Sequence, residues 1–235
     1  MTLRDRLRKL AQSELLLVLA LVAALGLALV RSQTRDVEPD EIEALHSGWM
    51  VLAGERPYAD FVQQHHPLHY VLLAALMRCT GEGAQAIVAA RALHFGFYLA
   101  ILALVWRIAL EVCGREAGRR VGLYAAILLA TSAVFANKVF DVRPDIPMIL
   151  AGLVALDAFL RHGRDRRARH LVIGGLALGL SFLFLQKTLF LMAALLALSA
   201  VRVVQRRMSL RELGLALGAF TLVLAPFCAW LVASG

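Results

Sequence analysis

The sequence predicts an all-α protein, a polytopic transmembrane helical bundle of about seven spans whose long first extracytoplasmic loop carries interfacial helices. Hydrophobic residues make up 60% of the 235 positions, and the mean hydropathy is +0.70, whereas ordinary soluble domains are about 45–50% apolar. This excess excludes a disordered chain and disfavours a soluble enzyme. The net charge of +8 would favour nucleic-acid binding in a soluble protein. Here the basic residues lie between apolar runs, so we interpret them as topology signals and expect no nucleic acid.

Apolar runs indicate the spans, because a helix needs about 20 residues to cross the hydrocarbon core. The first run, residues 15–30, is Leu-rich and lacks a cleavage site, so we expect a signal anchor rather than a removable signal peptide. The run 171–201 is too long for one span and has basic flanks, so we expect a hairpin with Lys187 near its turn. The seven spans are expected near residues 14–31, 84–107, 119–138, 144–161, 168–186, 187–204 and 211–233.

The distribution of positive charge predicts the orientation. Four segments between the runs hold 17 of the 25 Lys and Arg, namely 1–13, 107–120, 161–170 and 202–212. Segment 31–83 holds 8 of the 17 acids. Because cytoplasmic loops are rich in Lys and Arg, we expect one membrane domain, 1–235, with a cytoplasmic N-terminus (1–13), an extracytoplasmic loop (31–83) and six further spans (84–235).

Residues 66–80 form a short apolar stretch inside this loop. We expect an interfacial helix there with Pro67 at its first position. The alternative makes it an eighth span and places 161–170 outside. Before it, Glu38-Pro39-Asp40-Glu41 predicts a helix start, because Pro and acids suit a first turn. Apolar residues follow at helical spacing at Ile42, Leu45, Trp49 and Leu52. On these residues alone, the acids are explained by helix capping.

Five motifs occur in order along the chain: Pro39-Asp40-Glu41, Gly54-Glu55-Arg56-Pro57-Tyr58, Asp60-Phe61 through Gln64-His65-His66-Pro67-Leu68, Arg143-Pro144-Asp145 and Gln186-Lys187-Thr188. With this order the chain resembles the C-type (GT-C fold) polytopic membrane glycosyltransferases, in the protein-mannosyltransferase and aminoarabinose-transferase-like branch. Members usually carry further spans, and often an outer domain, after this core. We therefore expect the C-terminal part to be absent here, with the chain truncated, minimal, or completed by a partner subunit.

The resemblance implies transfer of a sugar from a polyprenyl-phosphate donor to a lipid, glycan or protein acceptor, with inversion, at the outer face of the cell inner membrane. It implies Asp40 as the base, with Glu41 second. Cations would stabilise the leaving phosphate. The candidates for this role are Arg56, Arg143 and Lys187, with Lys138 as a further one. The residues expected to bind substrate are Arg56, Tyr58, Asp60, His65, His66, Asp141, Arg143, Asp145 and Lys187. We expect Asp40, His66, Arg143 and Lys187 to line one cavity.

Structural explanations stand beside these roles. Arg143 and Asp145 flank a proline and would form an ion pair with each other, and Lys187 would reach out of the membrane from a helix end. His65 and His69 have the spacing of metal ligands on one helix face. No third ligand follows at a fixed spacing, so we expect no cofactor. A divalent metal is an alternative that the sequence does not support.

Other residues carry purely structural expectations. Asp157 should face the basic residues of 161–170, and Gly174, Gly175 and Gly179 should allow close helix packing. The basic loops should meet anionic membrane lipids. Three scattered cysteines indicate no disulfide framework. The alternative function is a non-catalytic polyprenyl-lipid-binding protein, such as a subunit of a split glycosyltransferase or of a lipid flippase. A small-solute transporter is disfavoured, because the two halves show no internal repeat.

Overall fold

The computed structural model describes residues 3–132, 135 and 140–234, and the side chains of 14–132, 135 and 140–232. The described residues contain helices and no strand, which confirms the all-α prediction. Close contacts divide the chain into two compact units. The first unit comprises residues 1–36 and 91–141, and the second comprises residues 37–90 and 142–235.

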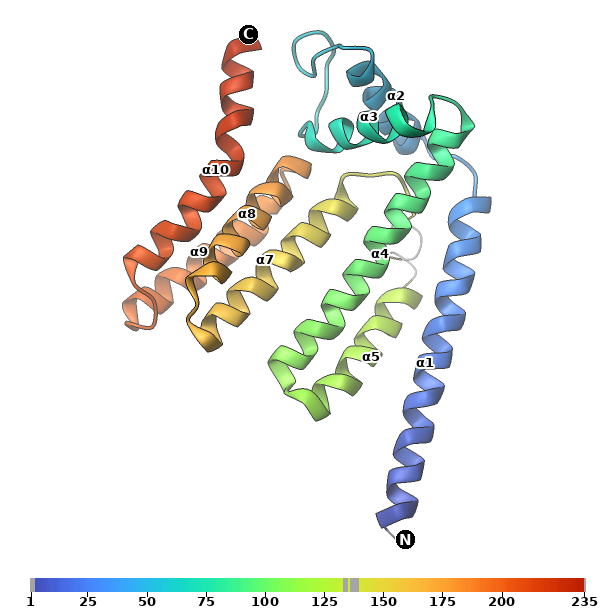
Figure 1. Cartoon of the computed structure of the whole chain (residues 1–235), viewed down its shortest axis with the longest axis vertical. Coiled ribbons are helices and arrows are strands. Elements are labelled where there is room, and N and C mark those ends of the chain that lie inside the picture. Colours follow the sequence, from blue (N-terminus) through green and yellow to red (C-terminus); the bar gives the residue numbers. More distant parts are fainter. Residues whose placement is uncertain (1–2, 133–134, 136–139, 235) are drawn as a thin grey trace. The chain divides into compact units, whose positions relative to one another are not determined.

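The first unit contains α1 (Leu3–Thr34), most of α4 (Ala84–Cys113) and α5 (Arg115–Thr131) (Figure 1). Helices α1 and α5 pack on each other. Glu14 of α1 forms ion pairs there with Arg119 and Arg120. Helix α5 also lies close against α4, because a Cβ added at Gly118 would come within 2.6 Å of the Ala109 carbonyl oxygen. Only Gly114 separates the two helices, so the basic segment 107–120 contains a tight turn.

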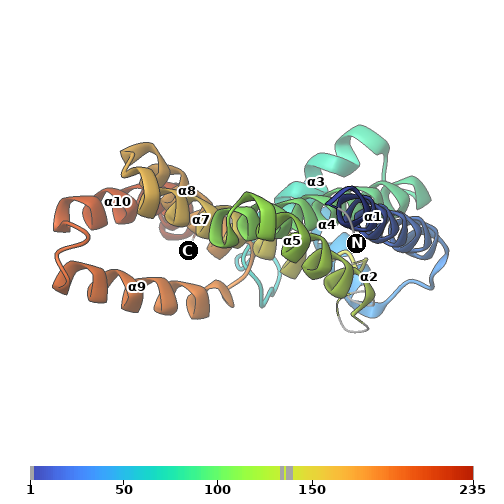
Figure 2. The same ribbon diagram turned by 90° about the horizontal axis from the view of Figure 1, so that it is seen from below.

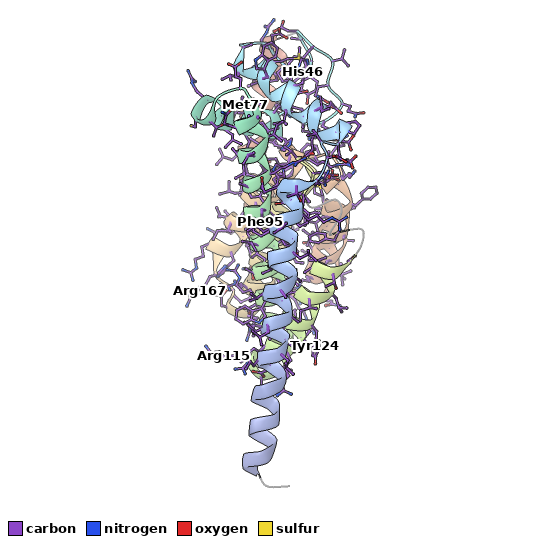
Figure 3. The ribbon with its side chains drawn as sticks, turned by 90° about the vertical axis from the view of Figure 1, so that its right-hand side faces the viewer. His46, Met77, Phe95, Arg115, Tyr124 and Arg167 are labelled. Carbon is purple, nitrogen blue, oxygen red and sulfur yellow. The ribbon has the colours of Figure 1, made fainter. Side chains whose placement is uncertain are left out.

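The second unit begins with two short helices, α2 (Pro39–Leu52) and α3 (Leu68–Thr80), which pack against each other. Figure 3 labels one residue of each helix, His46 and Met77. Gly48 brings the two backbones together, since a Cβ there would lie 2.8 Å from the Cβ of Leu73. The core between the helices contains Ala44, Leu45, Tyr70, Leu73 and Met77 together with Ala86, Ala90 and Val142.

The remaining helices of this unit are α7 (Asp145–Asp165), α8 (Ala168–Phe184), α9 (Thr188–Val204) and α10 (Leu210–Ser234). Helix α8 packs on both α7 and α10. Added Cβ atoms show how close these crossings are: at Gly174 one would meet the ring of Phe159, and at Gly179 it would meet Val223, each at 2.8 Å. At Gly175 one would meet the backbone of Ala216. The predicted packing role of these glycines is confirmed.

Helix α9 makes fewer contacts than its neighbours. Figure 2 shows it set apart from α10 over much of its length. Thr188, at its beginning, is its one buried residue within the described part of the chain. Its hydroxyl hydrogen-bonds to that of Ser181 in α8 at 2.8 Å. The chain therefore turns back between α8 and α9, and the predicted break of the run 171–201 at Lys187 is confirmed.

Four of the described helices are long and apolar enough to cross a membrane: residues 14–34 of α1, and α4, α7 and α10. Helices α8 and α9 are apolar but have 17 residues each, and α5 also has 17. The count of seven spans, the orientation and the single membrane domain thus stay predictions. Helix α3 is short, with 13 residues. Pro67 is its N-cap rather than its first residue, which corrects the expected start by one position. The Pro67 carbonyl accepts a helical hydrogen bond from the Val71 N–H.

Candidate active site

The beginning of α2 holds two adjacent acids in different environments. Pro39 is the first helical residue, and Glu38 and Glu41 form a capping box in which the Glu41 carboxylate accepts a hydrogen bond from the Glu38 N–H at 3.2 Å. The Glu41 side chain is fully buried. Its other oxygen accepts a hydrogen bond from the Val142 N–H at 3.4 Å. Glu41 thus satisfies the Glu38 N–H at the helix start, and through the Val142 N–H it ties α2 to the segment before α7.

Asp40 lies beside Glu41 and points the other way. Its side chain is 50% exposed and forms an ion pair with Arg143 at 2.5 Å. Arg143 also contacts Asp145 at 3.5 Å, and Asp145 accepts a hydrogen bond from the Lys187 ammonium at 2.7 Å. We call these four residues the ion-pair chain. It joins the beginning of α2, the beginning of α7 and the turn between α8 and α9.

The ion-pair chain alternates acid and base, so its formal charge is zero. Its inner members, Arg143 and Asp145, are about one-quarter exposed, whereas Lys187 at one end is 55% exposed. Exposed ion pairs contribute only about 0–1 kcal/mol each. The ion-pair chain therefore contributes little to stability. It holds two cations and two carboxylates at one place, and its end residues, Asp40 and Lys187, are about half exposed.

Lys187 occupies a position that is electrostatically unfavourable for a cation. It is the N-cap of α9, where the helix dipole favours a negative charge. Asp145, in the first turn of α7, is favourably placed on its own helix and also offsets the charge of Lys187. Such a lysine at a helix N-terminus, in an otherwise charge-free run of 31 residues, requires a reason beyond helix stability.

The histidines that precede α3 anchor the loop between α2 and α3. The Nδ1 atom of His66 hydrogen-bonds to the Phe182 carbonyl in α8, and the His66 ring lies against those of Phe182 and Phe227. The Tyr58 hydroxyl donates to the His65 carbonyl at 2.6 Å. Burial raises the pKa of Tyr58 to about 12, so this hydroxyl keeps its proton at physiological pH. The structure thus gives His66 contacts with α8 and α10, and His66 forms no hydrogen bond or ion pair with the four described residues of the ion-pair chain.

Arg56 and Asp60 bind each other in the same loop. The guanidinium donates two hydrogen bonds to the carboxylate, each at 3.0 Å, and the Arg56 N–H donates a third at 2.8 Å. These bonds, with the charge of Arg56, lower the pKa of Asp60 to about 2. The pair closes a turn, and neither residue forms a hydrogen bond or ion pair with the four described residues of the ion-pair chain. A substrate role for Arg56 or Asp60 would require this pair to open.

Asp141 belongs to the first unit. It forms a buried ion pair with Arg35. Close by in sequence, the Arg35 and Asp36 carbonyls each accept a hydrogen bond from the Arg91 guanidinium at 3.0 Å. Asp141 and Arg91 thus fix the end of α1 and the beginning of the following loop. Lys138, the further candidate cation, lies outside the described residues.

Within the described residues, no group of three or more His, Cys, Asp and Glu side chains is arranged to hold a metal ion. His69 is fully buried in α3, so the His65 and His69 pair does not form one exposed helix face. The three cysteines are free and exposed. Asp157 forms an ion pair with Arg161 at 3.1 Å, as expected from its place near the basic segment 161–170.

Several contacts had no signal in the sequence. The Trp49 indole donates to the Glu82 carboxylate at 2.7 Å, which joins the end of α2 to the loop before α4. The hydrogen bond between Glu41 and Val142 joins residues separated by 101 positions. Periodicity within a segment carries no information about such partners. The acidic first turn of α2 indicated helix capping, but it did not indicate that Glu41 would be buried.

A comparison with known families supports the resemblance. The family model described as dolichyl-phosphate-mannose-protein mannosyltransferase matches residues 64–232, more than two-thirds of the chain. The match includes His65, His66, Arg143, Asp145 and Lys187, and begins after Asp40. No curated protein and no solved structure matches the chain. The chain therefore belongs to the dolichyl-phosphate-mannose-protein mannosyltransferase family, which places it among the membrane glycosyltransferases of the C type.

Proposed function

We propose that the chain transfers a sugar from a polyprenyl-phosphate donor to a lipid, glycan or protein acceptor, with inversion, at the extracytoplasmic face of the cell inner membrane. The observation that carries this proposal is the family match over residues 64–232. The ion-pair chain supports it, because it supplies a carboxylate and two cations at one place.

In the proposed reaction the acceptor hydroxyl oxygen attacks C1 of the sugar, and the bond from C1 to the phosphate oxygen breaks. Attack from the side opposite the phosphate inverts the configuration at C1. The hydroxyl proton passes to the Asp40 carboxylate, which acts as general base. The electrons of the broken bond remain on the polyprenyl phosphate, which leaves with one more negative charge.

Arg143 and Lys187 would stabilise this developing charge. Each is paired with a carboxylate in the structure, so a bound phosphate would become an additional or replacement partner. Lys187 is suited to this, because it is more than half exposed and one of its three N–H donors is bound to Asp145. Cations fixed near a leaving group lower the barrier most when the negative charge appears there during reaction.

The burial of Glu41 favours Asp40 as the base. Glu41 is enclosed by hydrogen bonds to the Glu38 and Val142 N–H groups, whereas the neighbouring Asp40 is half exposed. We therefore assign Glu41 a positioning role: it holds the beginning of α2 so that Asp40 faces Arg143. Its loss should change the geometry of the ion-pair chain rather than remove a proton acceptor.

The test is a transfer assay from a polyprenyl-phosphate sugar in vesicles, using the longest natural form of the protein. Asp40→Asn keeps the size of the side chain and removes the proton acceptor, so the rate of transfer should fall about 10²–10⁴-fold. Glu43→Gln is the matched control, because Glu43 is an exposed acid of the same helix outside the ion-pair chain. It should keep the wild-type rate.

The outcomes separate the alternatives. Full activity in Asp40→Asn together with loss in Glu41→Gln would move the base by one residue. Full activity in both variants would remove the proposed mechanism. A wild-type protein that binds polyprenyl-phosphate sugar without transferring it, with every acceptor class supplied, would support the non-catalytic lipid-binding subunit instead.

A further inference from the structure

A concave region of the second unit shares no lining residue with the ion-pair chain. It is a groove among α7, α8, α9 and α10 with about 720 Å³ of empty space, its open side included. Four of its apolar lining residues, one from each helix, are Phe159, Leu178, Leu195 and Phe220.

Three polar side chains line this groove, and one of them, His162, already has partners within the protein. The two ring nitrogens of His162 contact the Arg167 carbonyl at 3.3 Å and the Glu212 carboxylate at 3.2 Å. Ser199 and Arg202 are one helical turn apart on α9 and both line the groove. Neither side chain makes a hydrogen bond or an ion pair with any residue that the structure describes. Arg202 therefore brings an unpaired guanidinium to a groove whose lining is otherwise mostly apolar.

A glycine in α7 leaves room for the guanidinium of Arg202. A Cβ added at Gly163 would come within 3.0 Å of one guanidinium nitrogen of Arg202. Because Gly163 has no side chain, the guanidinium reaches across from α9 to the surface of α7. The cation thus lies beside the basic end of α7, where it lines the groove.

The surroundings of Arg202 carry a large excess of positive charge. Segments 157–170 and 202–212 contain nine arginines and three acids. All three acids are engaged by other cations or histidines: Asp157 by Arg161, Asp165 by Arg167 and His170, and Glu212 by Arg166 and His162. Arg202 has no carboxylate partner, so the missing counter-charge must come from outside the described protein.

We propose that this groove binds an anionic glycerophospholipid, with its headgroup phosphate on Arg202 and Ser199 and an acyl chain along the apolar walls. The proposal does not depend on the glycosyltransferase reaction. An acyl chain is the apolar occupant that a bilayer supplies to a groove between membrane helices. Basic pockets at the ends of such helices are suited to anionic headgroups. A zwitterionic lipid satisfies the apolar walls but leaves the positive charge of Arg202 without a net counter-charge.

The test is a lipid titration of the purified full chain in non-ionic detergent, followed by native mass spectrometry. The probes are palmitoyl-oleoyl-phosphatidylglycerol and the phosphatidylcholine with the same acyl chains. Wild-type protein should retain one phosphatidylglycerol about fivefold more tightly than phosphatidylcholine, the scale of one arginine near an anionic headgroup. Arg202→Gln should remove this preference, and Arg202→Lys should restore most of it.

Two further variants keep the proposal falsifiable. Arg211→Gln removes an equal charge from an exposed arginine outside the groove lining, and it should change the preference far less than Arg202→Gln. Leu217→Trp fills the groove from α10 and should weaken retention of both lipids. Helicity and gel-filtration volume show whether each variant is folded.

Equal losses in Arg202→Gln and Arg211→Gln would overturn the proposal in favour of diffuse attraction to basic loops. Equal affinity for the two lipids in the wild type, or undiminished binding in a folded Leu217→Trp, would overturn it as well. Displacement of bound phosphatidylglycerol by polyprenyl phosphate at equal concentration would show that the groove holds the carrier lipid, which contradicts the assignment to a glycerophospholipid.

Discussion

Replacing Gly175 with alanine is the sharpest test of how α8 and α10 cross. A Cβ at this position would lie 2.8 Å from the Ala219 Cβ and 3.1 Å from the Ala216 carbonyl carbon, and closer still to the Ala216 oxygen. Carbon atoms are in optimal contact at about 3.5–4.0 Å. Two of these three neighbours are backbone atoms, so the helices themselves must separate. Overpacking of this kind costs about 1–3 kcal/mol.

Gly218→Ala on α10 is the matched control, because a Cβ there meets nothing within 4 Å. Both substitutions remove a helical glycine and gain about 1 kcal/mol of helix propensity. The difference between the two variants therefore isolates the steric cost of about 1–3 kcal/mol. At about 2–4 °C per kcal/mol for a chain of this size, Gly175→Ala should melt roughly 2–12 °C below Gly218→Ala.

The assay is thermal unfolding in detergent, followed by circular dichroism and by the loss of monodisperse protein on gel filtration. Both variants are measured in the same detergent at the same protein concentration. Equal melting temperatures would refute the close crossing of α8 and α10. So would a higher melting temperature for Gly175→Ala than for Gly218→Ala.

Three other predictions use different observables. Lys187→Ala should lower kcat/KM for transfer about 10–100-fold and weaken donor binding, because a charge-assisted bond is worth about 1.5–3 kcal/mol, and Lys187→Arg should recover part of the loss; wild-type kinetics in Lys187→Ala would contradict its role. The folded-state pKa of Asp60 is lowered from 3.8 to about 2, so the stabilisation by Arg56 is present above pH 4 and is lost as the pH falls through about 2; NMR titration of Arg56→Gln should show this pKa moving back toward 3.8, and an unmoved value would refute the assigned cause. With the native cysteines replaced, a Cys at position 164 should react with an impermeant thiol reagent only when the cytoplasmic side is accessible; labelling from outside would reverse the predicted orientation.

Local features of the fold follow from short sequence signals. The first turn of α2 begins at Pro39 because proline lacks the N–H that this position leaves unused, and two acids suit the helix dipole. Asp157 and Arg161 pair because residues four apart lie on one helix face. Gly175 and Gly179 lie at crossings because only a missing side chain allows such close approach. Each signal depends on residues within one or two turns.

The partners in the candidate site depend on distances along the chain that no local pattern contains. The motif Arg143-Pro144-Asp145 indicates an ion pair, but it does not indicate that Asp40 shares the same arginine. His66 has the chemistry of a phosphate ligand, yet its ring packs on Phe182 and binds the carbonyl of that residue. Tertiary packing therefore decided which polar residues of the segment between α1 and α4 remain available to a ligand.

The members of the ion-pair chain are synthesised at different times. Lys187 follows Asp40 by about 150 residues. At about 5–20 residues per second, the ribosome adds Lys187 roughly 7–30 s after Asp40. Over the last 42 residues of this interval Asp145 has no lysine partner. The loop before α3 lacks its contact with Phe182 until that residue has been added. The candidate site is therefore completed only after α2, α3 and α7 have been made, and substitutions at the turn between α8 and α9 should act on biogenesis as well as on the finished protein.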